Sequence, residues 1–394
     1  MNFIDDELER LRRSGLYREL KVVEEGQGAR VKINGREVIQ LSSNNYLGLA
    51  AHPELKKAAS SAIEKYGCGS GASRLISGNL KLHEKLEEKI SSFKGTESSL
   101  LFNSGYTANL GVISSLCGRG DIIFSDKLNH ASIIDGCLMS GAEIKRYPHK
   151  DIDALERFLK STPTSMHRCG GKKRLIVTDG VFSMDGDIAP LREIIKLAKD
   201  YSALVMVDDA HATGVLGKKG GGTAEHLGLD DGIDIVMGTF SKALGSFGGF
   251  IAGRREIREF LINKARSFIY TTSLPPSVIA SSIRAIEIAE EGNYLRDSLW
   301  RNVNCLKEGL KNMGFDTMKS QSHIIPVFIG DADKTMEMSQ MLLREGVFVQ
   351  GIRPPTVPQG KSRLRVTVTS SHSVDDINIA LESFKRAGER LGII

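Results

Sequence analysis

Five short apolar runs in the middle of the chain each lead into residues that could take part in catalysis. One run, DIVMG, is followed by Lys242, with Thr239 and Ser241 just before it. A lysine is usually a hydrated surface residue, so its place at the end of a buried run needs a reason. The other four runs lead into residues of a matching kind, namely Gly105 with Tyr106, His130, Ser183, and Asp208 with His211. Packing alone does not explain why all five runs end in this way.

These residue types together fit one cofactor chemistry. A lysine amine can form a Schiff base with an aldehyde cofactor, and an aspartate can keep the ring nitrogen of such a cofactor protonated. The start of a helix can bind its phosphate. Pyridoxal phosphate has these three needs, so we expect it to bind here. Taken singly, Asp208 could equally be a strand-end cap and His130 a helix N-terminal residue; their combination with Lys242 favours the cofactor.

The elements that must position these residues follow an alternating pattern. Between His52 and Leu274, amphipathic segments of helical length alternate with short apolar runs such as SSLLFN, RLIVTDG and ALVMVDDA. Such runs, several of them rich in β-branched residues, are typical of buried strands in a mostly parallel sheet. The pattern predicts an α/β domain, in which ligands bind beyond the carboxyl ends of the strands. The polar residues fall at those ends.

Three regions are expected along the chain. Residues 1–51 contain a short amphipathic helix and a hairpin signal at Asn34-Gly35, and they form an N-terminal extension. Residues 52–280 form the large cofactor-binding α/β domain. Residues 281–394 form a smaller α+β domain, with strand candidates HIIPVFIG and RLRVTVTSSH.

Composition argues against several other classes of protein. The net charge of +5 is small and dispersed, so we expect no nucleic acid partner. The five cysteines lie far apart without a CxxC pair, so neither a metal site nor a disulfide framework is expected. The N-terminus lacks the apolar segment of a secretory signal, and no apolar run is long enough to span a membrane. We expect a cytoplasmic enzyme. The role of the polar loop at residues 161–174 stays open.

Five longer motifs carry a family resemblance: SNNYLGL, LNHASIIDG, VTDGVFSMDGDIAPL, VDDAHATGVLG and TFSKALG. Over essentially its whole length the chain resembles the α-oxoamine synthases. These are fold-type I pyridoxal phosphate enzymes, which join an amino acid to an acyl thioester with loss of carbon dioxide. The resemblance implies a fold-type I transferase, with a large α/β domain around a mostly parallel sheet and a smaller α+β C-terminal domain.

The resemblance also implies roles for residues at matching positions. Lys242 would be the Schiff-base lysine, Asp208 the partner of the pyridine nitrogen, and His211 a donor to the phenolic oxygen of the cofactor. His130 would stack on the ring. Further cofactor contacts would come from Gly105, Tyr106, Ser183, Thr239 and Ser241. In the family the site lies between two subunits of a homodimer, so Thr271 or Thr272 would reach the phosphate in the partner subunit.

On the substrate side, Asn44 and Arg365 match positions that meet the amino acid, and Arg18 matches a substrate-binding arginine of one branch of the family. Arg353 and Thr356 lie in GIRPPTVPQGKSRLR, where they would serve the acyl chain. This stretch resembles the branch that uses L-alanine and a pimeloyl thioester, carried by coenzyme A or an acyl-carrier protein, in biotin synthesis. Glycine C-acetyltransferase, which uses glycine and acetyl-CoA, stays an alternative, as does an enzyme that accepts both substrate pairs.

Overall fold

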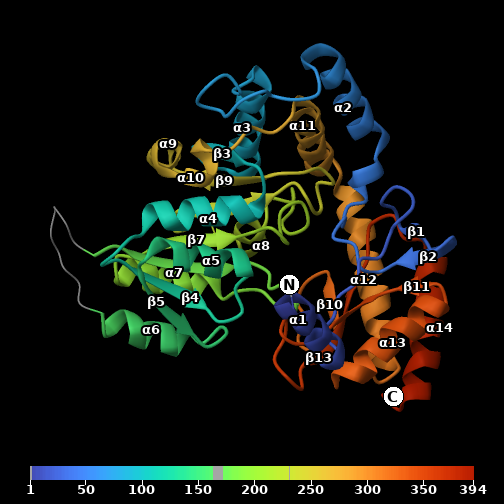
Figure 1. Cartoon of the computed structure of the whole chain (residues 1–394). Helices are drawn as coiled ribbons and strands as arrows, with labels where there is room; N and C mark the ends of the chain where they lie inside the picture. The colour runs from blue at the N-terminus through green and yellow to red at the C-terminus, as the bar shows by residue number, and fades with distance from the viewer. Residues whose placement is uncertain (1, 163–171, 230) are drawn as a thin grey trace. The chain divides into compact units, whose positions relative to one another are not determined.

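The protein is represented by a computed structural model that describes residues 2–162, 172–229 and 231–394 (Figure 1). These residues form two compact units. The large unit comprises Asn44–Ser183 and Asp187–Asp297, and the small unit comprises Met1–Ser43, Met184–Gly186 and Ser298–Ile394. The expected division at residues 51 and 280 stays a prediction. Residues 163–171 of the polar loop at 161–174 lie outside the described part of the chain.

The large unit is built on a seven-stranded sheet with the order β3-β9-β8-β7-β6-β4-β5. Strand β9 runs antiparallel to both of its neighbours, and the remaining pairs are parallel. Most of the strands are buried along their whole length, which explains why they appear in the sequence as continuous apolar runs. The strands are β3 (Ser98–Phe102), β4 (Ile122–Asp126), β5 (Glu143–Tyr147), β6 (Arg174–Asp179), β7 (Leu204–Asp208), β8 (Ile235–Thr239) and β9 (Gly249–Gly253).

Helices cover both faces of this sheet. Successive strand residues point to opposite faces, so Ile123 and Ile122 enter two different apolar clusters. The cluster around Ile123 includes residues of α4 (Gly105–Leu116), α5 (Ala131–Ser140), α9 (Arg255–Lys264) and α10 (Arg266–Ile269). The cluster around Ile122 includes residues of α6 (Ile152–Lys160) and α7 (Leu191–Asp200). The remaining helices of the unit are η1 (Leu49–Ala51), α2 (Pro53–Tyr66), α3 (Lys81–Lys94), α8 (Thr223–Leu227) and α11 (Pro276–Glu291).

The small unit contains two three-stranded sheets, β1-β2-β11 and β10-β13-β12. The predicted hairpin is present, because β1 and β2 pair antiparallel around Asn34 and Gly35, which both have positive φ angles (51° and 73°). The elements are α1 (Asn2–Arg13), β1 (Arg30–Ile33), β2 (Arg36–Gln40), β10 (Ile324–Gly330), α13 (Ala332–Arg344), β11 (Val347–Phe348), β12 (Gln350–Ile352), β13 (Ser362–Thr367) and α14 (Val374–Leu391). Helix α12 (Asn293–Asn312) begins in the large unit and continues into the small one.

Within residues 2–162, 172–229 and 231–394, every helix is too short or too polar to cross a membrane. The same residues contain no group of three or more histidine, cysteine, aspartate or glutamate side chains placed to hold a metal ion.

Candidate active site

A cavity of about 210 Å³ in the large unit brings together the residues that were predicted at the ends of the five runs. The sheet explains why they meet. Asp179 and Asp208 are the last residues of β6 and β7 and are register partners, and Thr239 is the last residue of β8. Parallel strands end at a common edge of the sheet, where ligands bind. The lining residues are Gly105, Tyr106, His130, Ser132, Asp179, Ser183, Asp208, Ala210, His211, Met237, Thr239, Ser241 and Lys242.

The start of helix α4 forms the part of the cavity suited to an anion. Ser104 caps the helix, since its Oγ accepts a hydrogen bond from the N–H of Thr107 (3.1 Å) and its own N–H donates to Thr107 Oγ1 (3.0 Å). The N–H groups of the first turn have no partner inside a helix and carry the positive end of its dipole. Thr239 Oγ1 accepts a hydrogen bond from the N–H of Ser241 (3.1 Å), which links two of the hydroxyl residues that line the cavity.

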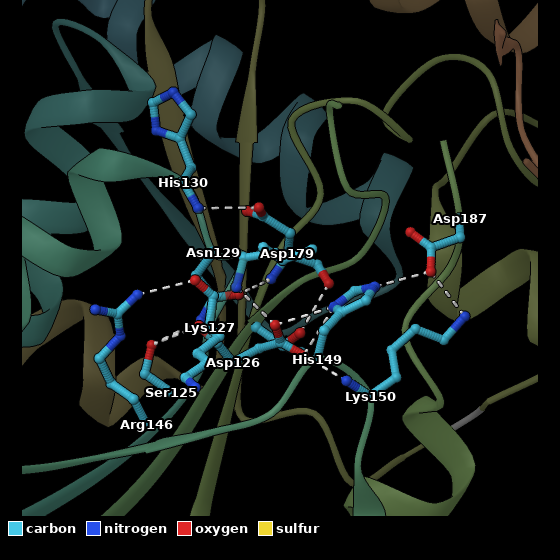
Figure 2. Close-up of polar contacts among 12 residues, drawn as sticks. Ser125, Asp126, Lys127, Asn129, His130, Arg146, His149, Lys150, Asp179 and Asp187 are labelled. Atoms are coloured by element: carbon cyan, nitrogen blue, oxygen red, sulfur yellow. Dashed lines mark hydrogen bonds and ion pairs between the residues drawn. The ribbon is translucent and has the colours of Figure 1, made fainter. Parts of the chain in front are cut away.

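Two neighbouring carboxyl groups, those of Asp179 and Asp208, line the cavity and have different hydrogen-bond partners. Both oxygens of Asp208 accept hydrogen bonds, from the N–H of Ala210 (3.0 Å) and from Nδ2 of Asn109 (2.8 Å). Asp179 accepts one from the main-chain N–H of His130 (3.0 Å; Figure 2). Burial, and then the negative charge of Asp208, raise the pKa of Asp179 well above its ordinary value. The negative charge of the pair is therefore best accommodated on Asp208.

Asp179 also holds the loop that carries His130. The N–H of Asp179 donates to Oδ1 of Asn129 (2.9 Å; Figure 2). The Nδ2 atom of Asn129 donates to the carbonyl oxygen of Val177 (2.8 Å). The sequence prediction missed Asp179, although it ends an apolar run just as Asp208 does. The signal was the aspartate near the end of RLIVTDG, whereas the prediction named Ser183, which follows this run.

The two histidines of the cavity have different surroundings. The Nδ1 atom of His130 lies 2.8 Å from Ser132 Oγ. Loss of hydration in the cavity lowers the pKa of His130, although the negative charge of Asp208 acts to raise it. A neutral ring is suited to stacking on a flat cofactor. His211 Nδ1 lies 2.8 Å from the hydroxyl of Tyr46, which in turn donates to Asn44 Oδ1 (2.9 Å). Tyr46 thus joins His211 to a predicted substrate residue, a link that sequence reasoning missed.

Thr271 and Thr272, also in the large unit, do not line the cavity. Nδ2 of Asn103 donates to Thr271 Oγ1 (3.2 Å) and to the carbonyl oxygen of Thr272 (2.9 Å), so Asn103 fixes the conformation of this segment. Its suggested contact with a partner subunit stays a prediction.

The remaining predicted substrate residues belong to the small unit. Arg353 donates from Nε to the carbonyl oxygen of Gly15 (2.9 Å) and from Nη2 to that of Tyr17 (3.0 Å). Arg18 is exposed, and its Nη2 lies 3.4 Å from Thr356 Oγ1. Arg365 lies on β13 and is buried. Arg353 therefore anchors the segment that presents Arg18 beside Thr356.

The cavity residues fit pyridoxal phosphate by the chemistry of their donor and acceptor groups. The α4 terminus with its neighbouring hydroxyls suits a phosphate. Asp208, with a donor on each oxygen, is a carboxylate suited to a protonated ring nitrogen. Lys242 supplies an amine in the same cavity. The fold and the cavity together define a fold-type I pyridoxal-phosphate-dependent transferase.

Comparisons with known proteins agree with this class. Residues 36–384 match the family model for aminotransferases of class I and II. The chain is 56% identical over 396 residues to the 8-amino-7-oxononanoate synthase of Citrifermentans bemidjiense, covering 100% of both chains. It is 53% identical over 393 residues to that of Geobacter sulfurreducens, covering 99% of both. The chain belongs to the α-oxoamine synthases, within the class I and II aminotransferase family.

Solved structures agree with this assignment. The serine palmitoyltransferase of Sphingomonas wittichii matches with a TM-score of 0.93 and 36% identity, over 99% of this chain and 98% of that one. A structure of SPT with its PLP internal aldimine matches with the same TM-score and 37% identity, over 99% and 98% of the two chains. The 8-amino-7-oxononanoate synthase of Francisella tularensis matches with a TM-score of 0.76 and 29% identity, over 91% and 99%. The predicted fold class, family and cofactor are confirmed.

Proposed function

We propose that this enzyme condenses L-alanine with a pimeloyl thioester to give 8-amino-7-oxononanoate, a step of biotin biosynthesis. The observation that carries the proposal is the full-length match, at 56% identity, to a relative of that name. In the reaction a carbon–carbon bond forms between the alanine Cα and the thioester carbonyl carbon. The carbon–sulfur bond breaks to release the thiol, and the carboxylate of alanine leaves as carbon dioxide.

When bound, pyridoxal phosphate supplies an electron sink for the pair left on the alanine Cα. The residues of the chain bind and orient the reactants around it. Asp208 would hold the proton on the ring nitrogen of the cofactor, and the neutral His130 ring would stack on the cofactor ring. The α4 terminus holds the phosphate, assisted by Thr239 and Ser241.

Proton transfer at the alanine Cα is assigned to Lys242. A neutral amine is a competent base, and Lys242 would supply such an amine in the cavity. We propose that Lys242 takes the α-proton and returns a proton to the same carbon after carbon dioxide has left. His211, held at Nδ1 by Tyr46, would contact the phenolic oxygen of the cofactor through its other ring nitrogen.

We propose that the substrate ends are recognised by arginines. A guanidinium binds a carboxylate with two parallel hydrogen bonds, so Arg365 suits the carboxylate of alanine. Asn44 is a separate candidate for contact with the amino acid. Arg18 and Thr356, which lie within 3.4 Å of one another, suit the far carboxylate of the pimeloyl chain. The bonds of Arg353 to Gly15 and Tyr17 support a role in holding Arg18 in place, alongside its predicted contact with the acyl chain. Either coenzyme A or an acyl-carrier protein would serve as the carrier.

A homodimer and a cytoplasmic location complete the proposal. The homodimer is supported by the segment at Thr271 and Thr272, which Asn103 fixes next to Tyr270, an aromatic residue that is 72% exposed. Mixing Lys242→Ala with a Thr271→Val/Thr272→Val variant tests the shared site. Mixed dimers should regain activity that neither variant has, whereas two self-contained sites would give no recovery.

The substrate test compares two reactant pairs on the cofactor-loaded enzyme. We expect thiol and carbon dioxide release with L-alanine and pimeloyl-CoA, and none with glycine and acetyl-CoA. Thiol release only from the second pair, whose condensation product keeps its carboxylate, would assign glycine C-acetyltransferase instead, and thiol release from both pairs would make the enzyme bifunctional. Lys242→Ala should abolish turnover. Lys199→Ala is the matched control, because Lys199 is 60% exposed and pairs with Asp231 on the surface.

A further inference from the structure

Helix α4 carries a fully buried asparagine directly behind the cavity. Asn109 is 0% exposed and lies among apolar core residues of the same helix, including Ala108, Val112 and Ile113. A buried amide destabilises a fold unless its polar atoms are hydrogen-bonded. An apolar residue would be the ordinary choice at this position, so the contacts of Asn109 indicate why an amide is there.

The Nδ2 atom of Asn109 uses its two hydrogens on two different partners. It donates to Asp208 Oδ2 and to Ser132 Oγ, each at 2.8 Å. Ser132 Oγ lies 2.8 Å from His130 Nδ1. A continuous chain of polar atoms, buried as far as Ser132, therefore runs from the Asp208 carboxylate, through Asn109 and Ser132, to the His130 ring.

The opposite end of the same amide shows which contacts decide its orientation. Asn109 Oδ1 is buried and has no hydrogen-bond partner among the described residues. Turning the amide over would place this oxygen against the Asp208 carboxylate, with two acceptors facing one another. The unsatisfied oxygen is thus the consequence of giving both N–H groups to Asp208 and Ser132.

We propose that Asn109 is a positioning residue, which holds the Asp208 carboxylate in the orientation required by the cofactor and links it through Ser132 to the His130 ring. The proposal rests on the proposed role of Asp208 as the partner of the ring nitrogen. Together with the N–H of Ala210, Asn109 gives Asp208 a donor on each oxygen, whereas the neighbouring Asp179 has the main-chain N–H of His130. Asn109 thereby places the negative charge of the pair on Asp208.

The test is the affinity of the cofactor-free protein for pyridoxal phosphate, measured without substrates. Asn109→Leu keeps the side-chain size and removes both donors. We expect its dissociation constant for pyridoxal phosphate to rise about 10- to 100-fold, as for loss of a hydrogen bond to a charged group. Asn302→Leu is the matched control. Asn302 is also buried and donates two hydrogen bonds, to the carbonyl oxygens of Thr369 and His372, but it lies in the small unit. Its dissociation constant should equal that of the parent.

Two further readouts separate positioning from a general loss of structure. Without the Asn109 donor, Asp208 is easier to protonate, so on acidification cofactor affinity should fall at a higher pH in Asn109→Leu than in the parent or in Asn302→Leu. In an Asp208→Asn background, Asn109→Leu should have little additional effect, because its partner charge is already gone. An equal fold-change in both backgrounds, or an unshifted pH dependence, would overturn the proposal.

Failure of this inference is distinguishable from failure of the proposed function. If the enzyme used other substrates, the affinity measurements would stand unchanged. If Asp208→Asn bound the cofactor as tightly as the parent, the role of Asp208 itself would be wrong. Should Asn109→Leu not fold, Asn109→Ala removes atoms only and carries the same expectations.

Discussion

Two consecutive aspartates, Asp208 at the end of β7 and Asp209 just after it, have different surroundings and different roles. Asp208 lines the cavity, and its two oxygens accept one hydrogen bond each from Ala210 and Asn109. Asp209 is 1% exposed and accepts hydrogen bonds from Lys94 Nζ (3.1 Å) and from the N–H and Oγ1 of Thr223 (3.1 and 2.6 Å). The same residue type thus belongs to two different environments one residue apart.

The difference lies in how completely each charge is enclosed. Lys94 Nζ spends its three hydrogens on Asp209, on Thr213 Oγ1 (2.8 Å) and on the carbonyl oxygen of Gly221 (2.7 Å). Burial lowers the pKa of Lys94, while the carboxylate of Asp209 opposes that shift. A closed network of this kind stabilises one conformation, whereas a carboxylate that faces a cavity remains available to a ligand. The fully hydrogen-bonded Asp209 therefore stabilises the fold, whereas the cavity-facing Asp208 is available for binding.

The largest effect is expected for the buried network of Lys94 and Asp209. Lys94→Met leaves the carboxylate of Asp209 buried without its cation, which should lower the free energy of unfolding by about 3–5 kcal/mol. Urea denaturation of the cofactor-free protein measures this. The control is Lys89→Met on the same helix, because Lys89 forms a partly exposed ion pair with Glu290 and should change stability by no more than about 1 kcal/mol. Equal losses in the two variants would contradict the comparison.

A smaller free-energy effect is expected for Asp208, which faces the cavity, and it should appear in catalysis and not in stability. Asp208→Asn keeps the shape of the side chain but removes the charge that we propose holds the ring nitrogen of the cofactor protonated. We expect kcat/KM to fall about 100- to 1,000-fold, as for loss of one preorganised electrostatic contact, with the free energy of unfolding of the cofactor-free protein nearly unchanged. Asp209→Asn should show the reverse pattern. If Asp208→Asn lost stability and kept its activity, the proposed catalytic role of Asp208 would be wrong.

The sequence predicted one side of this comparison better than the other. Asp208 could be identified because a buried strand ends there and the ends of parallel strands meet. Lys94 looks like an ordinary basic residue in the last turn of α3, and its partner Asp209 lies 115 residues further along the chain. Asn109 lies 99 residues from Asp208, and Tyr46 lies 165 residues from His211. Partners this distant are set by the fold and leave no local signal.

The fold shows the same limit. The apolar runs predicted six of the seven strands of the large sheet and missed β9 (Gly249–Gly253). The Asn34-Gly35 signal predicted the hairpin, since turn geometry acts locally. Local patterns did not indicate that β2 pairs in parallel with β11, where Ile39 lies opposite Val347. Nor did they indicate that residues 1–43 join the C-terminal segment in one compact unit. Such long-range pairing depends on which buried edges are available once the rest of the chain has folded.

The smallest expected effect concerns a charge that lies between these two cases. His149 is partly exposed and holds two carboxylates, with Nδ1 3.0 Å from Asp126 Oδ1 and Nε2 2.9 Å from Asp187 Oδ2 (Figure 2). Burial alone would lower the pKa of His149, but the hydrogen bonds and charges of Asp126 and Asp187 outweigh it and raise that pKa to about 9. The protonated ring therefore ties the end of β4 to the segment at Asp187.

The pH dependence follows from the direction of this shift. The pKa is raised above the value of about 6.5 in the unfolded chain, so the stabilisation is fully present below pH 6.5 and is lost as the pH rises through about 9. With allowance for solvent screening of a partly exposed group, we expect the parent to be about 1–2 kcal/mol more stable than His149→Gln at pH 6.5. Denaturant unfolding at a series of pH values should show this advantage shrinking up to and beyond pH 9. A difference that stayed constant with pH would mean that His149 contributes by shape, through its edge-on contact with Phe182, and not by charge.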